Sequence, residues 1–153
     1  MNRIVEIQRL LEKSSDESNP TAEALVEILR DVQHIAVVGL SRYLEKPARR
    51  VPSYLAAKGF DVIPVNPRAD RLLGRKSWHS LEDVPGPVDM VLIFRPSPEA
   101  SEIVEQAMAR PEHPVIWLQS GIHAPEAVAA GRAAGHTVVQ DLCIFRVHRA
   151  LIG

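Results

Sequence analysis

The chain has one cysteine among its 153 residues, and only 5% of its residues are aromatic. A single cysteine cannot form an intramolecular disulfide, and it excludes a zinc site built from several cysteines. Because aromatic rings are scarce, the core must consist mainly of Val, Ile, Leu and Ala. The hydrophobic content of 46% is sufficient for one globular domain of this length.

Neither sign of charge dominates, since 18 basic and 19 acidic residues leave a formal net charge of -1. This balance gives no support for binding to nucleic acid or to a membrane surface. The apolar runs are far shorter than the roughly 20 residues that span a bilayer. Glu6 places a negative charge too early for a signal peptide. We therefore expect a cytoplasmic protein that binds neither nucleic acid nor membranes.

The first 33 residues show helical patterns. Apolar side chains recur with helical spacing over residues 4–11, and residues 14–19 interrupt the pattern. Asn19 and Pro20 predict the N-cap and the first residue of a second helix. We therefore predict that residues 1–33 form a helical prefix, which packs on the domain of residues 34–153 and covers an edge or a face of its sheet.

Short apolar runs alternate with helical patterns after residue 33. The predicted strands cover residues 35–38, 60–65, 88–94, 115–118 and 137–139. Helices are predicted around residues 51–59, from residue 97 and from residue 125. Residues 68–80 are predicted to form a loop with a short extended piece around Ser77 and Trp78. The alternation is typical of an α/β fold: a doubly wound, mostly parallel sheet in a Rossmann-like arrangement of three layers.

In such a sheet, ligands bind beyond the carboxyl ends of the strands. The segments that follow the predicted strands are residues 39–42, 65–68, 94–97, 119–121 and 141–143. The first segment is the most informative, because Gly39 allows a ligand to approach the backbone and a helix begins shortly after it. Arg42, Lys46, Arg49 and Arg50 add positive charge there, so we expect a phosphate group.

The same segment lacks the glycine pattern of dinucleotide-binding proteins. Only Gly39 is present, and Ser41 and Leu44 stand at the positions of the second and third glycines. The second predicted strand also ends without the acidic residue that holds the ribose of NAD. NAD is therefore disfavoured, whereas Arg68 and Arg71 could bind the ribose phosphate that NADP or coenzyme A carries.

Several short motifs occur together between residues 34 and 148. They are Val37-Val38-Gly39-Leu40-Ser41, Lys46-Pro47 followed by Arg50, Phe60-Asp61-Val62-Ile63-Pro64-Val65-Asn66-Pro67, Phe94-Arg95-Pro96, Trp117-Leu118-Gln119-Ser120-Gly121 and Asp141-Leu142-Cys143. Because these motifs occur in this order and spacing, the chain resembles small bacterial and archaeal CoA-binding proteins. These are single Rossmann-like domains, similar to the CoA-binding domain of the succinyl-CoA synthetase α subunit.

The resemblance implies that CoA or an acyl-CoA lies across the strand ends. Its pyrophosphate would rest on the turn of Gly39, Leu40 and Ser41, beside Arg42, Lys46 and Arg50. Its adenosine would lie near Val65, Asn66 and Pro67 and near Phe94, Arg95 and Pro96. Its pantetheine arm would point towards Gln119, Ser120, Gly121 and Cys143.

No motif of the chain indicates catalysis. Synthetase chemistry needs a phosphorylated histidine in a second domain, and the six histidines include no helical pair with metal-binding spacing. We therefore expect binding without catalysis. An NADP- or CoA-dependent enzyme of unknown reaction, or a CoA-sensing module that binds a protein partner, are the alternatives. Cys143 is either an inert buried cysteine or a thiol that forms a mixed disulfide with CoA.

Overall fold

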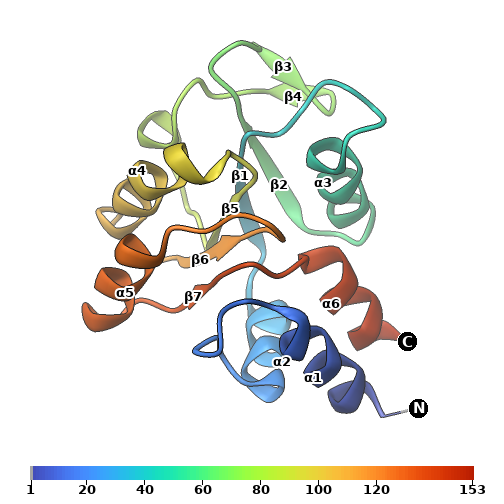
Figure 1. The fold of residues 1–153 in the computed structure, drawn as a ribbon. Coiled ribbons are helices and arrows are strands. Elements are labelled where there is room, and N and C mark those ends of the chain that lie inside the picture. Colours follow the sequence, from blue (N-terminus) through green and yellow to red (C-terminus); the bar gives the residue numbers. More distant parts are fainter. Residues whose placement is uncertain (1) are drawn as a thin grey trace.

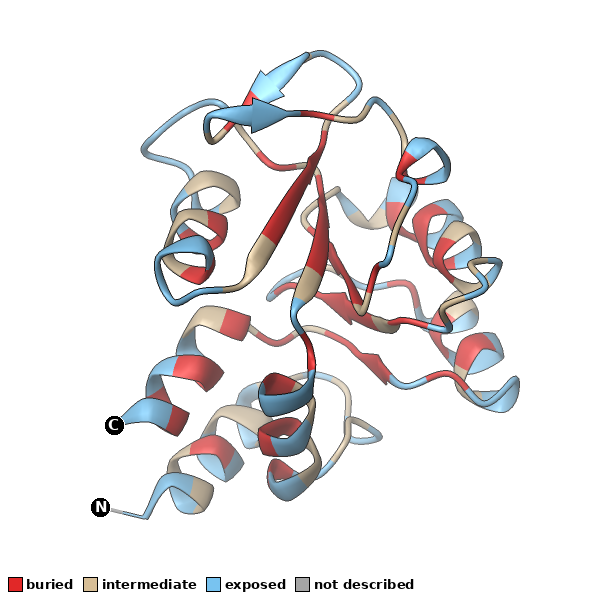
Figure 2. Ribbon diagram, turned by 180° about the vertical axis from the view of Figure 1, so that it is seen from behind, coloured by how far each residue is buried: buried red, intermediate tan, exposed pale blue. Residues whose placement is uncertain are grey.

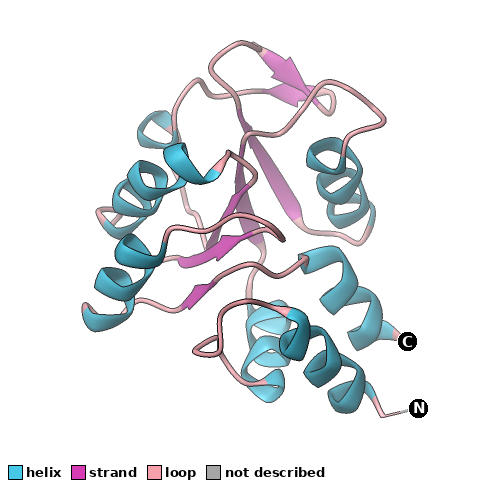
Figure 3. Cartoon of the chain, in the orientation of Figure 1, coloured by secondary structure: helices cyan, strands magenta, loops and turns pink. Residues whose placement is uncertain are grey.

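The computed structural model describes residues 2–153 and contains a five-stranded sheet with helices on both sides (Figures 1 and 3). The helices are α1 (Arg3–Lys13), α2 (Ala22–Asp31), α3 (Pro47–Ala57), α4 (Ser97–Met108), α5 (Pro125–Ala133) and α6 (Ile144–Ile152), with the short 3-10 helix η1 (Leu81–Asp83). The strands are β1 (His34–Val38), β2 (Asp61–Val65), β3 (Arg71–Leu72), β4 (Arg75–Lys76), β5 (Met90–Ile93), β6 (Val115–Leu118) and β7 (Val138–Val139). Within residues 2–153, no helix combines the length and apolar character that crossing a membrane requires.

The strand order of the sheet is β2-β1-β5-β6-β7, and every neighbouring pair is parallel. From β1 the chain passes to β2 on one side and then crosses back to β5 on the other. The order therefore reverses between β1 and β5. In doubly wound folds, ligands bind beyond the carboxyl ends of the strands at such a point. The predicted α/β fold with a doubly wound parallel sheet is confirmed.

Both faces of this sheet are buried (Figure 2). In β1, Ile35 and Val37 belong to one apolar cluster, whereas Ala36 and Val38 belong to the other, because side chains of a strand point alternately to its two faces. Helices α2, α3 and α6 complete the first cluster, and α4 and α5 complete the second. Burial on both sides explains why the strands are nearly continuous runs of Val, Ile and Leu.

Trp117 links the sheet to the C-terminal helix. Its side chain is fully buried in β6, and its indole Nε1 donates a hydrogen bond to the carbonyl oxygen of Leu142 at 2.8 Å. This bond satisfies the polar atom of the ring, as a buried tryptophan requires. It also holds the segment that leads from β7 into α6.

Two predicted local structures are wrong. Helix α2 begins at Ala22 rather than at Pro20, and its N-cap is Thr21, whose Oγ1 accepts a hydrogen bond from the N–H of Ala24 at 3.1 Å. The side chain of Asn19, the predicted cap, instead contacts the backbone of Gln140. Within the predicted loop of residues 68–80, β3 and β4 form an antiparallel hairpin. The short extended piece predicted around Ser77 and Trp78 is confirmed, because Trp78 forms a parallel bridge with Val65 of β2.

Helix α6 was not predicted from the sequence. Its amphipathic pattern is clear in the structure, because Val147 and Leu151 are buried while Arg146 and Arg149 are exposed. The helix packs between α1 and α3 on one side of the sheet (Figure 1). The pattern covers only nine residues, or about two and a half turns, which is a weak periodic signal.

Helix α1 packs against α2 and α6 rather than directly on the sheet. Ile7 is its one buried residue, with no exposed surface, and it belongs to the apolar cluster that contains Leu25 and Val147. The division into a prefix of residues 1–33 and a domain of residues 34–153 stays a prediction. The burial of Ile7 provides a way to measure how strongly α1 is coupled to the fold.

Ile7→Ala should lower the free energy of unfolding by about 2–5 kcal/mol, because it removes a fully buried side chain and leaves a cavity. Val5→Ala is the matched control, since Val5 lies on the same helix and is 37% exposed. The control should change the free energy by less than about 0.5 kcal/mol. Urea denaturation measures the free energy of unfolding of both variants. Equally small changes in Ile7→Ala and Val5→Ala would show that α1 unfolds independently of the domain.

Candidate functional site

A cavity of about 610 Å³ lies at the carboxyl ends of the strands, and we call it the strand-end cavity. Its lining comes from the segments that follow β5, β6 and β7, from the N-terminal ends of α3 and α6, and from the C-terminal half of α1. The lining includes Leu10, Lys13, Lys46, Ala48, Phe94, Gln119, Ser120, Asp141, Cys143 and Arg146.

The N-terminal end of α3 faces this cavity and has no acidic residue in its first turn. Pro47 has no N–H group, and within residues 2–153 the N–H of Ala48 has no hydrogen-bond acceptor. Lys46 at the N-cap and Arg50 one turn later add two positive charges. A free N–H group at the positive end of a helix dipole attracts anions, so this terminus suits a phosphate.

The N-terminal end of α6 lies at the same cavity. Cys143 is its N-cap and Arg146 belongs to its first turn, which has no acidic residue, and both side chains line the cavity. Two positive helix ends therefore meet one cavity, together with the cations Lys46 and Arg146. Neither cation forms an ion pair within residues 2–153, which leaves their charge available to a ligand.

The side chain of Gln119 holds the start of α6 in place. It is 5% exposed, its Oε1 accepts a hydrogen bond from the N–H of Ile144 at 2.8 Å, and its Nε2 lies 3.5 Å from Sγ of Cys143. Both ends of the amide are thus used within the protein. Gln119 positions Cys143 at the cavity, a role that its place after β6 did not reveal.

The turn after β1 is closely packed against Arg95. Gly39 has a φ of +92°, and a Cβ added there would lie 2.9 Å from Cδ of Arg95. The position therefore requires glycine. Arg95 in turn forms an ion pair with Glu99 at 2.5 Å, and its hydrogen bond holds the pKa of Glu99 below the usual range. The guanidinium of Arg95 is thus already occupied by a carboxylate.

The structure brings some of the predicted site residues to the strand-end cavity: Lys46, Phe94, Gln119, Ser120 and Cys143. Arg50 lines the adjoining groove described below. The lining of neither space includes Gly39, Leu40, Ser41, Arg42, Val65, Asn66, Pro67, Arg95, Pro96 or Gly121. The side chains of Leu40 and Val65 are buried in the core. Asn66 Nδ2 donates to the carbonyl oxygen of Leu40 at 2.9 Å, so its amide joins the ends of β1 and β2.

A second space of about 970 Å³ lies between α1, α3 and α6. We call it the arginine groove, because its lining includes Arg9, Arg50, Arg146 and Arg149. It shares Leu10, Pro47, Val51, Cys143 and Arg146 with the strand-end cavity, so the two spaces adjoin. The residues of α1 and α6 that line the two spaces, apart from Cys143 at the N-cap of α6, were not predicted from the sequence. The arginines three residues apart at positions 146 and 149 were the available signal for one charged helix face.

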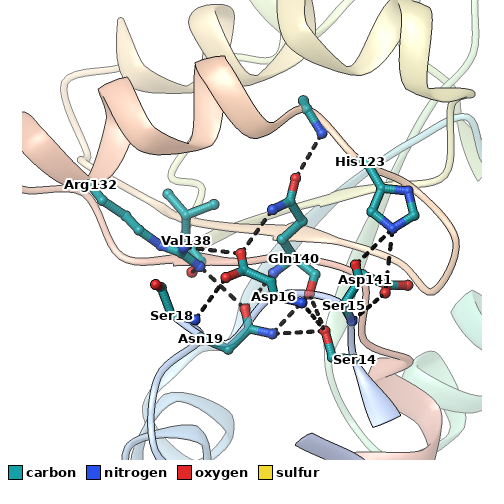
Figure 4. Close-up of polar contacts among 11 residues, drawn as sticks. Ser14, Ser15, Asp16, Ser18, Asn19, His123, Arg132, Val138, Gln140 and Asp141 are labelled. Carbon is teal, nitrogen blue, oxygen red and sulfur yellow. Dashed lines mark hydrogen bonds and ion pairs between the residues drawn. The ribbon is translucent and has the colours of Figure 1, made fainter. Parts of the chain in front are cut away.

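A network of polar side chains attaches the α1–α2 connection to the end of β7 (Figure 4). Asn19 Oδ1 accepts from the N–H of Gln140 at 2.8 Å, and Asn19 Nδ2 donates to the carbonyl oxygen of Gln140 at 2.9 Å. Asp16 accepts from Gln140 Nε2 at 2.8 Å and pairs with Arg132 at 3.0 Å. These bonds hold the C-terminal end of α1 at the cavity, where Leu10 and Lys13 form a wall.

Asp141 also attaches the α1–α2 connection to the segment that follows β7 (Figure 4). It accepts hydrogen bonds from the N–H groups of Gly121 at 2.6 Å and Ser15 at 2.8 Å, and His123 Nε2 lies 3.4 Å from its carboxylate. Burial opposes ionisation of Asp141, but the hydrogen bonds from Gly121 and Ser15 outweigh it and hold its pKa below the usual value. The carboxylate therefore joins three loops at the rim of the cavity.

Comparison with known families matches residues 33–149 to the family described as CoA binding domain. The chain belongs to this family. The resemblance found in the sequence motifs is therefore confirmed, and the match begins next to β1 and ends within α6.

The proteins that are similar to this chain include small proteins and a part of a large one. The chain is 37% identical over 130 residues to uncharacterized protein YneT of Bacillus subtilis, covering 85% of this chain and 96% of that protein. A solved structure of a hypothetical protein from Pyrococcus horikoshii is similar with a TM-score of 0.82 and 36% identity, over 90% of this chain and 99% of that one. An ADP-forming acetate–CoA ligase of Archaeoglobus fulgidus is 33% identical over 98 residues, which are 61% of this chain and only 15% of the ligase.

The hydrogen bonds of Asp141 predict a pH-dependent contribution to stability in this member of the family. Because its pKa is lower in the folded than in the unfolded chain, the contribution is complete above the unfolded pKa of about 3.9 and is lost as the pH falls towards the folded pKa. Asp141→Asn should therefore destabilise the protein at pH 7 and have a smaller effect at pH 3.

Urea denaturation of the protein and of Asp141→Asn at pH 7, 5 and 3 measures this difference. Asp31→Asn is the control, since its side chain is exposed and makes no hydrogen bond within residues 2–153. A difference between the protein and Asp141→Asn that stays constant from pH 7 to pH 3 would contradict the role of the carboxylate.

Proposed function

We propose that this chain binds CoA or an acyl-CoA in the strand-end cavity and catalyses no reaction on it. The observation that carries the proposal is the meeting of two helix N-termini, both without acidic residues, at one cavity beyond the strand ends. Such a cavity favours a phosphorylated ligand. Membership of the CoA binding domain family supports CoA among the phosphorylated ligands.

The residues around the cavity fit the parts of CoA. The free N–H of Ala48, with Lys46 and Arg50, would bind the pyrophosphate at the N-terminal end of α3. The pantetheine arm would run past Ser120 to Cys143. The adenosine would then lie beside the ends of β2 and β5, where residues 66–68 and 94–96 are at least partly exposed.

The polar groups at the cavity support binding without catalysis. Ser15, His123 and Asp141 lie together, but Ser15 Oγ and the Asp141 carboxylate both approach the same ring nitrogen of His123, at 3.0 and 3.4 Å. A histidine that activates a serine uses one nitrogen for the serine and the other for the carboxylate. The likeness to the acetate–CoA ligase covers only 15% of that enzyme, so its reaction is not carried over.

Isothermal titration with CoA, acetyl-CoA, NAD and NADP tests the proposal. CoA and acetyl-CoA should bind, and NAD should not, because no carboxylate stands at the end of β2 to hold its ribose. Lys46→Gln should raise the Kd of CoA about threefold to tenfold, since it removes a cation from the phosphate site. Lys58→Gln, at the opposite end of the same helix, should leave the Kd unchanged. Binding of NADP without binding of CoA would overturn the proposal.

Cys143 provides an independent test, because it is the single thiol of the chain and lines both spaces. Saturating acetyl-CoA should slow alkylation of Cys143 by iodoacetamide by about tenfold or more, since a pantetheine arm beside the sulfur blocks access. Acetyl-CoA is chosen because its own sulfur is a thioester and forms no disulfide. Intact mass measures the rate, with NAD as the control ligand. An unchanged rate at saturation would place the arm elsewhere.

A further inference from the structure

The loop that joins β1 to α3 carries exposed apolar side chains beside the strand-end cavity. We call residues 42–47 the Tyr43 loop, and all of them are exposed. Leu44 and Tyr43 are the most exposed large apolar side chains within residues 2–153, at 70% and 50%. In Figures 1 and 2 the loop runs beside the β3–β4 hairpin, which follows β2. Lys46 belongs to the proposed phosphate site, but the two apolar side chains have no part in it.

Hydrogen bonds hold the two ends of the Tyr43 loop together. The N–H of Ser41 donates to the carbonyl oxygen of Ala48 at 3.0 Å. Pro52, four residues after Ala48 in α3, has no N–H group to donate to that carbonyl. The Oγ of Ser41 accepts from the N–H of Tyr43 at 3.0 Å, and the N–H of Lys46 donates to the carbonyl oxygen of Tyr43 at 3.1 Å. The backbone on both sides of Tyr43 is therefore held in place while its ring faces solvent.

Two cations lie at the ring of Tyr43. The guanidinium carbon of Arg42 is 5.4 Å from the ring centre, and Nζ of Lys46 is 5.5 Å from it. Neither cation forms an ion pair within residues 2–153, and neither does Glu45, the acidic residue of the loop. The loop thus keeps one positive charge in excess. An aromatic ring with cations beside it suits a nucleotide, because the base stacks on the ring and the phosphates meet the cations.

The Tyr43 loop also connects the cavity with the place proposed for the adenosine. Lys46 lines the strand-end cavity and Tyr43 does not, so the ring lies just outside the cavity. The loop starts beside the end of β2, because the N–H of Gly39 donates to the carbonyl oxygen of Val65 at 2.9 Å. In CoA one ribose separates the adenine from the pyrophosphate. A pyrophosphate beside Lys46 therefore brings the adenine within reach of the Tyr43 ring.

We propose that Tyr43 binds the adenine ring of CoA by stacking. This inference rests on the proposed function, since it needs the pyrophosphate beside Lys46. The adenine covers the exposed ring of Tyr43, and Arg42 and Lys46 bind the pyrophosphate next to it. Tyr43 thus determines the affinity for the nucleotide end of the ligand, whereas the strand-end cavity holds the pantetheine arm.

Titration of CoA against variants at position 43 tests this role. Tyr43→Leu should raise the Kd of CoA about fivefold to tenfold, because it removes the stacking of a base on an aromatic ring. Tyr43→Phe should leave the Kd unchanged, since stacking does not use the hydroxyl. Ile152→Ala is the control, because Ile152 is 44% exposed on α6 and lines neither space. The adenine proton signals of bound CoA should shift upfield in NMR spectra of the protein and of Tyr43→Phe, and not in those of Tyr43→Leu.

A second titration separates stacking from an effect on Lys46. The rise in Kd caused by Tyr43→Leu should persist in a protein that also carries Lys46→Gln. Its disappearance there would overturn the inference, since the ring would then only position the Lys46 ammonium group.

The remaining outcomes distinguish this inference from the proposed function. An unchanged Kd in Tyr43→Leu, or an equal rise in Tyr43→Phe, would overturn the inference and leave CoA binding in the cavity standing. Failure of the unaltered protein to bind CoA would overturn both. Urea denaturation verifies that each variant is folded, and the variants at position 43 should be as stable as the protein because Tyr43 is half exposed.

Discussion

Because both faces of the sheet are buried under helices, the strand-end cavity forms beyond the carboxyl ends of the strands. Parallel strands direct their carboxyl ends to one edge, and the helices that return between them start at that edge. Helices α3 and α6 therefore bring their N-terminal ends to the same cavity. The positive end of each helix dipole adds to the charges of Lys46 and Arg146, so the electrostatic character of the site follows from the topology.

The contacts that attach the α1–α2 connection beyond β7 also shape the strand-end cavity. β7 is the last strand of the sheet, and the side chain of Asn19 pairs with both backbone polar groups of Gln140 just beyond it. This pairing satisfies both backbone polar groups of the residue that follows the strand. It also holds the C-terminal half of α1 over the cavity and beside α6. A change in the α1–α2 connection would thus affect stability and the shape of the site together.

The strands and the fold class could be predicted from the sequence because buried parallel strands are distinct runs of Val, Ile and Leu. Phe94, Ser120 and Cys143 could be placed at the site because each follows a strand closely, and Lys46 because it is a cation at the start of a helix. The parts played by Leu10, Lys13 and Arg149 could not be predicted. They lie on helices α1 and α6, which pack against each other although they come from opposite ends of the sequence. Hydrophobic periodicity predicts which face of a helix is buried, but it does not predict which other helix packs on that face.

The sequence by itself determined the α/β class and the motifs that relate the chain to CoA-binding proteins, and it predicted the strand ends as the place of a ligand. The tertiary structure alone decided which of the predicted residues reach a cavity and which serve the fold. Gln119 is the clearest case, because its amide is used by Ile144 and Cys143, residues 24 or more positions away. Local residue patterns do not specify which distant groups a polar side chain will meet, since the packing of the whole domain sets those distances.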